Sequence, residues 1–252
     1  MDYQFPQQPA LKRTLFAVAL AVACGNASAL PEFTWNPSAA GLTGPSFVAD
    51  NIIVSNFATV TFTSATTFHE AGFLGVSSFQ LAGTDIAVGG LNSTYSLFFQ
   101  FTGDGVINGP FSGLTYSLYG TNSVPTFGPG GAISGLVAPT LLATGSLISG
   151  DTGEINGLPF ADATVTFNGA SSPFFVSPPS SSFYDNMALT IKGGTVTATP
   201  NGYMIDNGAG SVNFASPIPE PETYALMMAG LGVMGIVARW RKGLRRSAER
   251  AA

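Results

Sequence analysis

Apolar and polar residues alternate with a period of two in several segments, and this pattern most constrains how the chain folds. In residues 58–63, Ala58, Val60 and Phe62 alternate with three threonines. The same pattern recurs at 95–102, 114–118, 163–167 and 195–199. Because successive side chains of an extended strand point to opposite faces, these segments are predicted to form half-buried β-strands.

Glycine-, proline- and asparagine-rich stretches separate the alternating segments, as at 102–105 and 127–131. Such stretches predict turns. No sustained helical period and no repeat of fixed length is present in the body of the chain, residues 30–215. Many short strands joined by turns predict an all-β fold, an antiparallel β-sandwich or a jelly-roll-like body.

The composition agrees with an exported β protein. Hydrophobic residues make up 45% of the chain, which is enough to build a core, and charged residues make up 9%. Typical soluble domains are about 25% charged. Between residues 30 and 218, ten acidic residues face a single basic one, Lys192. Nucleic-acid binding requires Lys and Arg against phosphate, so this class of function is excluded.

The N-terminus predicts a secretory signal peptide at residues 1–29. Lys12 and Arg13 precede an apolar run at 15–23, and small residues follow up to Ala27 and Ala29, after which we expect cleavage. Cleavage before Cys24 in a lipoprotein signal is the alternative, although Ala21 stands where such signals usually have leucine. Loss of residues 1–29 removes the only cysteine, so no disulfide is expected.

The body lacks the residues of common catalytic sites. His69 is the only histidine, and no G-x-S-x-G motif occurs. His69 is therefore expected at the surface or in a turn. Asp151-Thr152-Gly153 matches the catalytic triplet of aspartic proteases, but no second copy is present and a hairpin turn is the preferred interpretation. A glycoside hydrolase using Glu70 and Glu154 is the enzymatic alternative, and we predict no enzyme activity.

Calcium is a further alternative. Oxygen ligands occur at Asp50-Asn51, Asp185-Asn186 and Asp206-Asn207-Gly208, in expected loops. These pairs are also common turn formers, so no cofactor is the preferred interpretation. Aromatic residues at Tyr119, Phe127, Phe183 and Tyr184 are the basis for an alternative function, a lectin-like or calcium-dependent polysaccharide-binding module.

The C-terminal segment, residues 216–252, combines three features. Pro219-Glu220-Pro221 precedes an apolar segment, from which we predict a single transmembrane helix at about 224–240. A basic cluster then contains Arg239, Arg241, Lys242, Arg245 and Arg246. By the positive-inside rule, this cluster stays cytoplasmic while the body lies outside the inner membrane.

This three-part tail resembles the PEP-CTERM sorting signal of Gram-negative bacteria. The resemblance implies export by the Sec machinery, transient insertion in the inner membrane, and processing by an exosortase at or near Pro219-Glu220-Pro221. It further implies that the protein reaches the cell surface or extracellular matrix.

The body has a second resemblance, carried by residues 47–52, residues 91–95 and the spacing of Phe and Gly. These segments are similar to flocculation-associated PEP-CTERM proteins. The similarity implies a structural role in flocs or biofilm, where the protein holds cells together within exopolysaccharide.

Overall fold

The computed structural model describes residues 30–156, 158–169, 173–177, 186–192 and 194–214. The chain divides into two compact units, Met1–Ser216 and Pro217–Ala252, and all described residues belong to the first. The expected signal peptide, residues 1–29, and the expected membrane helix, at about 224–240, lie outside the described residues.

Strands dominate the described part of the chain, in which the only helical elements are two short 3-10 turns. In chain order the elements are β1 (Phe33–Trp35), η1 (Pro37–Ala40), β2 (Phe47–Ala49), β3 (Asn51–Phe62), β4 (Thr67–Leu81), β5 (Thr84–Ile86), β6 (Ser96–Val106), β7 (Phe111–Thr121), β8 (Thr126–Gly128), η2 (Pro129–Gly131), β9 (Ala132–Ser134), β10 (Thr140–Ile155), β11 (Leu158–Thr166), β12 (Phe175–Ser177), β13 (Asn186–Lys192), β14 (Thr195–Thr199) and β15 (Gly202–Phe214).

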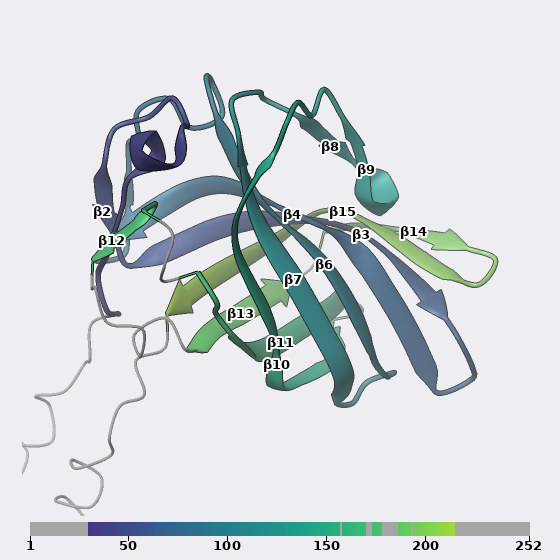
Figure 1. The fold of residues 1–252 in the computed structure, drawn as a ribbon. Helices are drawn as coiled ribbons and strands as arrows, with labels where there is room; N and C mark the ends of the chain where they lie inside the picture. Colours follow the sequence, from purple (N-terminus) through teal and green to yellow (C-terminus); the bar gives the residue numbers. More distant parts are fainter. Residues whose placement is uncertain (1–29, 157, 170–172, 178–185, 193, 215–252) are drawn as a thin grey trace, which may run out of the picture. The chain divides into compact units, whose positions relative to one another are not determined.

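Eight long strands form a closed antiparallel barrel (Figure 1). Their order around the barrel is β3-β4-β6-β7-β10-β11-β13-β15, and β15 pairs back to β3. β5 and β14 pair only with β4 and β15, respectively. The all-β antiparallel prediction is confirmed. The sandwich or jelly roll is corrected, because the eight long strands of one sheet close on themselves through the pairing of β13 with β15.

The alternating segments place their apolar side chains inside this barrel. In β3, the side chains of Ala58 and Val60 are buried, while Thr59 and Thr61 lie on the outward face. Leu97, Phe99 and Phe101 of β6 are likewise buried. The segment at 195–199 forms a strand as predicted, but β14 lies beyond the closed ring and Val196 remains exposed.

An aromatic cluster around Trp35 fills one end of the barrel. The small sheet β12-β1-β2 lies there, and the Trp35 side chain is fully buried. The centroid of its ring lies 5.0 Å from that of Phe174 and 5.5 Å from that of Phe79, at the end of β4. Phe33 links this cluster to Phe214, at the end of β15, with centroids 5.2 Å apart. The cluster therefore joins the N-terminal strand to the barrel wall.

A hairpin of β8 and β9 packs on the outside of the barrel. The Phe127 ring stacks on Phe57 with centroids 5.6 Å apart and lies 5.8 Å from Phe98. The Thr59 hydroxyl donates a hydrogen bond of 2.9 Å to the Gly130 carbonyl. Phe98 occupies an outward position in β6, yet this cover buries it. The hairpin thus explains an apolar residue on the polar face of a strand.

Replacing Trp35 should test the importance of the aromatic cluster. We expect Trp35→Ala to lower the free energy of unfolding by about 3–5 kcal/mol, because the loss of a large buried ring leaves a cavity. Urea denaturation followed by circular dichroism measures the change. Val196→Ala is the matched control and should change stability by less than about 0.5 kcal/mol, since Val196 is exposed. Equal effects of the two substitutions would contradict this role of Trp35.

Candidate functional site: a cavity inside the barrel

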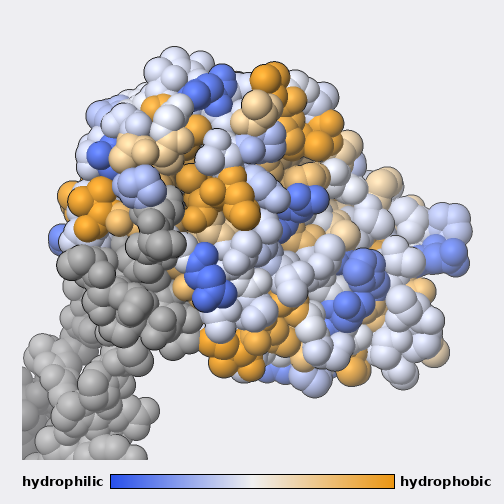
Figure 2. All heavy atoms as spheres, viewed as in Figure 1, coloured by the Kyte–Doolittle hydropathy of each residue, from blue (hydrophilic) through white to orange (hydrophobic). Residues whose placement is uncertain are grey.

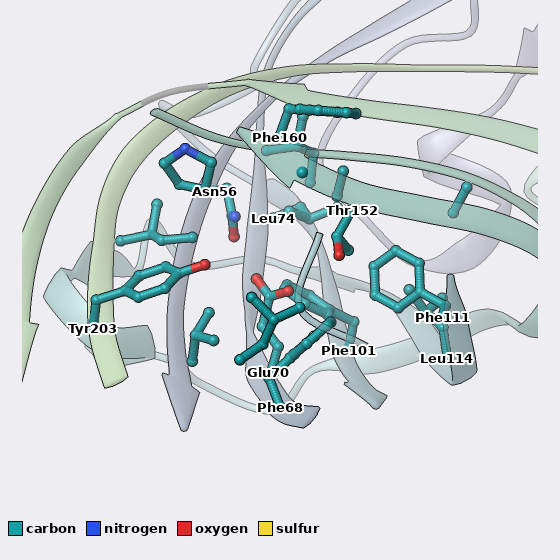
Figure 3. A pocket seen from close by; sticks show the side chains of 18 of the residues that line it. Asn56, Phe68, Glu70, Leu74, Phe101, Phe111, Leu114, Thr152, Phe160 and Tyr203 are labelled. Carbon is teal, nitrogen blue, oxygen red and sulfur yellow. The ribbon is translucent and has the colours of Figure 1, made fainter. Parts of the chain in front are cut away.

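The interior of the barrel contains a cavity of about 100 Å³ (Figure 3). Most of its lining is apolar and comes from strands all around the ring. The apolar lining includes Val60, Phe68, Leu74, Phe99, Phe101, Phe111, Leu114, Ala163, Val165, Ile191, Ile205 and Val212. Its exposed lining residues include Phe62, Asn108 and Glu154, near the ends of β3, β6 and β10. The cavity therefore reaches the end of the barrel opposite Trp35.

Inward-facing glycines in β6 shape the wall of this cavity. A Cβ atom on Gly105 would lie 2.8 Å from the Phe68 ring, and one on Gly103 would lie 3.3 Å from the Phe111 ring. These two rings instead pack edge to face, with centroids 5.9 Å apart. The missing side chains on β6 let the aromatic residues of β4 and β7 line the space.

Glu70 is the buried charged residue of the cavity. It lies on β4 in the inward register of Phe68 and Leu74, and only 8% of its surface is exposed. Burial raises the pKa of the Glu70 carboxyl from 4.5 to about 7, because an apolar surrounding disfavours the charged form. A hydrogen bond from the Asn56 side chain and the proximity of His69 lower the pKa by less. The carboxyl is therefore half protonated near neutral pH.

Asn56 is the polar neighbour of Glu70. It occupies an inward position on β3 and is 2% exposed. Its side chain bonds to Glu70, but its Oδ1 atom is buried without a hydrogen-bond partner. A buried acceptor without a donor is unfavourable and is uncommon in folded proteins. Asn56 also lines the cavity, so this acceptor lies in its wall.

Tyr203 and Glu154 bring two further polar groups to the lining. Burial raises the pKa of Tyr203 to about 12, and the charges of Glu70 and Glu154 add to this rise. Figure 3 shows the Tyr203 hydroxyl and the Glu70 carboxyl both projecting into the cavity. Nothing in the sequence places Glu70 near Glu154, whereas in the structure both residues line the same cavity.

The Asp151-Thr152-Gly153 segment lies within β10 and pairs with β11, so its interpretation as a hairpin turn was wrong. The Thr152 hydroxyl lies 3.1 Å from the carbonyl oxygens of both Val106 and Gly109, and the Thr152 amide donates a 2.8 Å hydrogen bond to the Gly109 carbonyl. This residue holds the β6–β7 turn against β10 at the mouth of the cavity.

Basic side chains are missing from the described lining of the cavity. Lys192 is the sole Lys or Arg among the described residues, and it does not line the cavity. His69 lies on the exposed outer face of β4, where its Nδ1 atom is 2.8 Å from Asp104 Oδ1. The surface position expected for His69 is confirmed. The cavity thus carries carboxylates without a compensating cation from the described chain.

The predicted calcium ligands do not come together among the described residues. The Asp50 carboxylate is buried and accepts a 2.7 Å hydrogen bond from the Ala82 amide. Asp206 and Asn207 lie at a bulge of β15 that is opposite the middle of β3. Asp50 instead precedes the first residue of β3. Asp185 lies outside the described residues, which contain no cluster of three acidic, His or Cys side chains suited to a metal ion.

Sequence reasoning did not identify the cavity, although one signal for it was present. Phe68, Glu70, Gly72 and Leu74 occupy alternate positions in one strand. When a carboxylate falls on the apolar face of an alternating segment, either the wrong face has been assigned as buried or the carboxylate is a buried functional group. The partner of this carboxylate, Asn56, comes from another strand and could not be identified without the pairing of β3 with β4.

The sorting residues predicted from the sequence lie outside the described part of the chain. These are Ala27, Ala29, Pro219, Glu220, Pro221, Arg239, Arg241, Lys242, Arg245 and Arg246. Among the residues that are described, no helix is both long and apolar enough to span a bilayer.

Comparison with known families identifies the C-terminal segment. Residues 217–242 match the model of the PEP-CTERM protein-sorting motif. The chain carries a PEP-CTERM sorting motif. The recognition of this motif in Pro219-Glu220-Pro221 and the apolar and basic residues that follow is confirmed. The motif marks an exported, exosortase-sorted protein of the cell surface or extracellular space. No curated protein and no solved structure matches the chain significantly.

Replacing Glu70 should change how stability depends on pH. Since the pKa of Glu70 is raised in the folded state, folding is penalised once pH exceeds 4.5, and the penalty is complete above about 7. We expect Glu70→Gln to stabilise the protein at pH 8 by up to about 3 kcal/mol and to have little effect at pH 4. Thermal unfolding at both values measures this. An equal shift at the two pH values would contradict the assignment.

Proposed function

We propose that this protein is a non-enzymatic component of the cell surface or extracellular matrix that promotes flocculation or biofilm cohesion together with exopolysaccharide. The PEP-CTERM motif at 217–242 is the observation that carries the proposal, since it marks export and exosortase sorting. The specific role in cohesion rests on the resemblance of residues 47–52 and 91–95 to flocculation-associated PEP-CTERM proteins.

The barrel has properties suited to a matrix protein. The pairing of β13 with β15 closes the ring of eight strands, so the edges of these strands are paired within the barrel and are not open to strands of other chains. Figure 2 shows few deep blue residues and mostly pale polar ones between apolar patches on the visible face. Outward threonines such as Thr61 on β3 carry hydroxyls, which can bond to neutral sugars without needing charge.

The position of Glu70 supports a role without catalysis. A glycoside hydrolase places two carboxyl groups on either side of a glycosidic bond. Glu70 is buried inside the barrel, and Glu154 is exposed near its mouth. A polysaccharide requires an open groove to reach both groups, whereas this cavity is inside a closed ring. If Glu70→Gln and Glu154→Gln retain full matrix function, the hydrolase alternative fails.

Calcium-dependent polysaccharide binding is less well supported as an alternative. The Asp50 carboxylate already holds the turn at Ala82, and the described acidic residues do not cluster. Glycan binding that is unaffected by chelation would agree with the preferred proposal.

The cohesion role is tested by gene deletion in the native cells. We expect cells without the protein to flocculate less while making the same amount of exopolysaccharide, because the protein links cells and polymer. Settling rate and total polysaccharide are the two measurements. Restoration by the wild-type gene is the control. Unchanged flocculation after deletion would contradict the proposal.

The sorting role is tested at the C-terminus. We expect mass spectrometry of the protein from native cells to find a terminus near residues 219–223, since an exosortase acts at or near the Pro-Glu-Pro motif. Pro219→Ala with Pro221→Ala should prevent this processing and leave the basic cluster attached. An intact Ala252 in the wild-type protein would instead indicate a simple anchor.

A further inference from the structure

We propose that the cavity inside the barrel is a binding site for one small apolar molecule that carries a protonated amine, with Glu70 and Asn56 receiving the ammonium group. The inference concerns the interior of the barrel and is independent of the proposed role in cohesion. It follows from the shape, polar groups and charge of the cavity.

The barrel leaves room for a ligand. The interior of an eight-stranded barrel is either filled by its own side chains or holds one small ligand. Here the end near Trp35 is filled by aromatic rings, whereas the other half contains a cavity of about 100 Å³. One water needs about 10–15 Å³ measured in this way, so the space suits several waters or one compound of the size of a substituted benzene.

The walls favour an apolar body. Phe68, Phe101 and Phe111 contribute aromatic rings, and branched aliphatic side chains cover much of the rest. Water against such walls forms few hydrogen bonds, so an apolar molecule that displaces it gains free energy. The faces of aromatic rings also attract cations, and an anionic ligand gains nothing from this attraction.

Two buried side chains of the lining, Asn56 and Glu70, offer hydrogen-bond acceptors. The Asn56 Oδ1 atom is buried without a donor, and the Glu70 carboxyl lies beside the same side chain. An ammonium group carries three donors and no acceptor, so it can bond to both oxygens at once. A hydroxyl carries a single donor and can satisfy only one of them.

The charge of the cavity selects the sign of the ligand. Glu70 and Glu154 are its acidic lining residues, and the described lining contains no Lys, Arg or His. An anion would be repelled and would have no basic partner. A cationic ligand would favour the ionised form of Glu70. Because the pKa of Glu70 is about 7, the affinity of the cavity for this ligand should rise as the pH increases through neutrality.

Three probes of similar size test whether the cavity prefers a cationic, a neutral or an anionic ligand: benzylamine, benzyl alcohol and benzoate. The full chain in phospholipid nanodiscs is titrated with each by isothermal calorimetry, and empty nanodiscs are the blank. At pH 8 we expect benzylamine to bind at least tenfold more tightly than benzyl alcohol, and benzoate to bind most weakly. At pH 5.5 the advantage of the amine should shrink. Absence of binding by all three, or equal or tighter binding of either other probe, would overturn the proposal.

Variants show whether the probe occupies the cavity. Glu70→Gln is nearly isosteric and should abolish the preference for the amine while benzyl alcohol still binds. Asp104→Asn is the matched control, because it removes a carboxylate from the outer face of the neighbouring strand and should leave binding unchanged. Ala161→Phe adds a ring to the lining and should weaken binding of all probes. Amine binding that is insensitive to Glu70→Gln and Ala161→Phe would overturn the proposal, with folding verified by the thermal transition.

Discussion

The pairing of β13 with β15 is the interaction on which the rest of this structure depends. Backbone hydrogen bonds connect these strands from Met187 opposite Phe214 to Lys192 opposite Ala209. Without this pairing the other seven contacts between neighbouring strands would form an open, curved sheet. Closure defines an inside and an outside for every strand, and the alternating side chains then divide between a core and a polar surface.

Closure also creates the setting for Glu70. In an open sheet its side chain would be hydrated and its pKa ordinary. Inside the ring, apolar neighbours remove water, and the raised pKa reports the free energy that ionisation costs. A protein selected only for stability would fill this space with an apolar side chain. A carboxyl beside an unpaired amide oxygen, in a cavity left open, is the kind of local inconsistency that marks functional sites.

The sorting motif and the barrel are separate parts of the chain. The PEP-CTERM motif at 217–242 and the barrel belong to different compact units. The motif determines where the protein goes and contains no information about what the barrel contacts. We propose two kinds of contact for the barrel: neutral polymers at its outer face, which is poor in charge, and a single small molecule in its interior. These roles do not compete, because they use opposite faces of the same strands.

The class of fold, the positions of many strands and the sorting signal could be predicted from the amino-acid sequence alone. These depend on local patterns: alternation within one strand, turn residues between strands, and a contiguous motif at Pro219-Glu220-Pro221. Closure into a barrel could not be predicted from these patterns, because apolar and polar residues alternate in the same way in a strand of a sandwich and in a strand of a barrel. The burial of Phe98 depends on a distant hairpin, and the position of Asp151 in a strand depends on pairing with β11. Only the tertiary structure could place Glu70 against Asn56, since register between β3 and β4 decides which inward side chains meet.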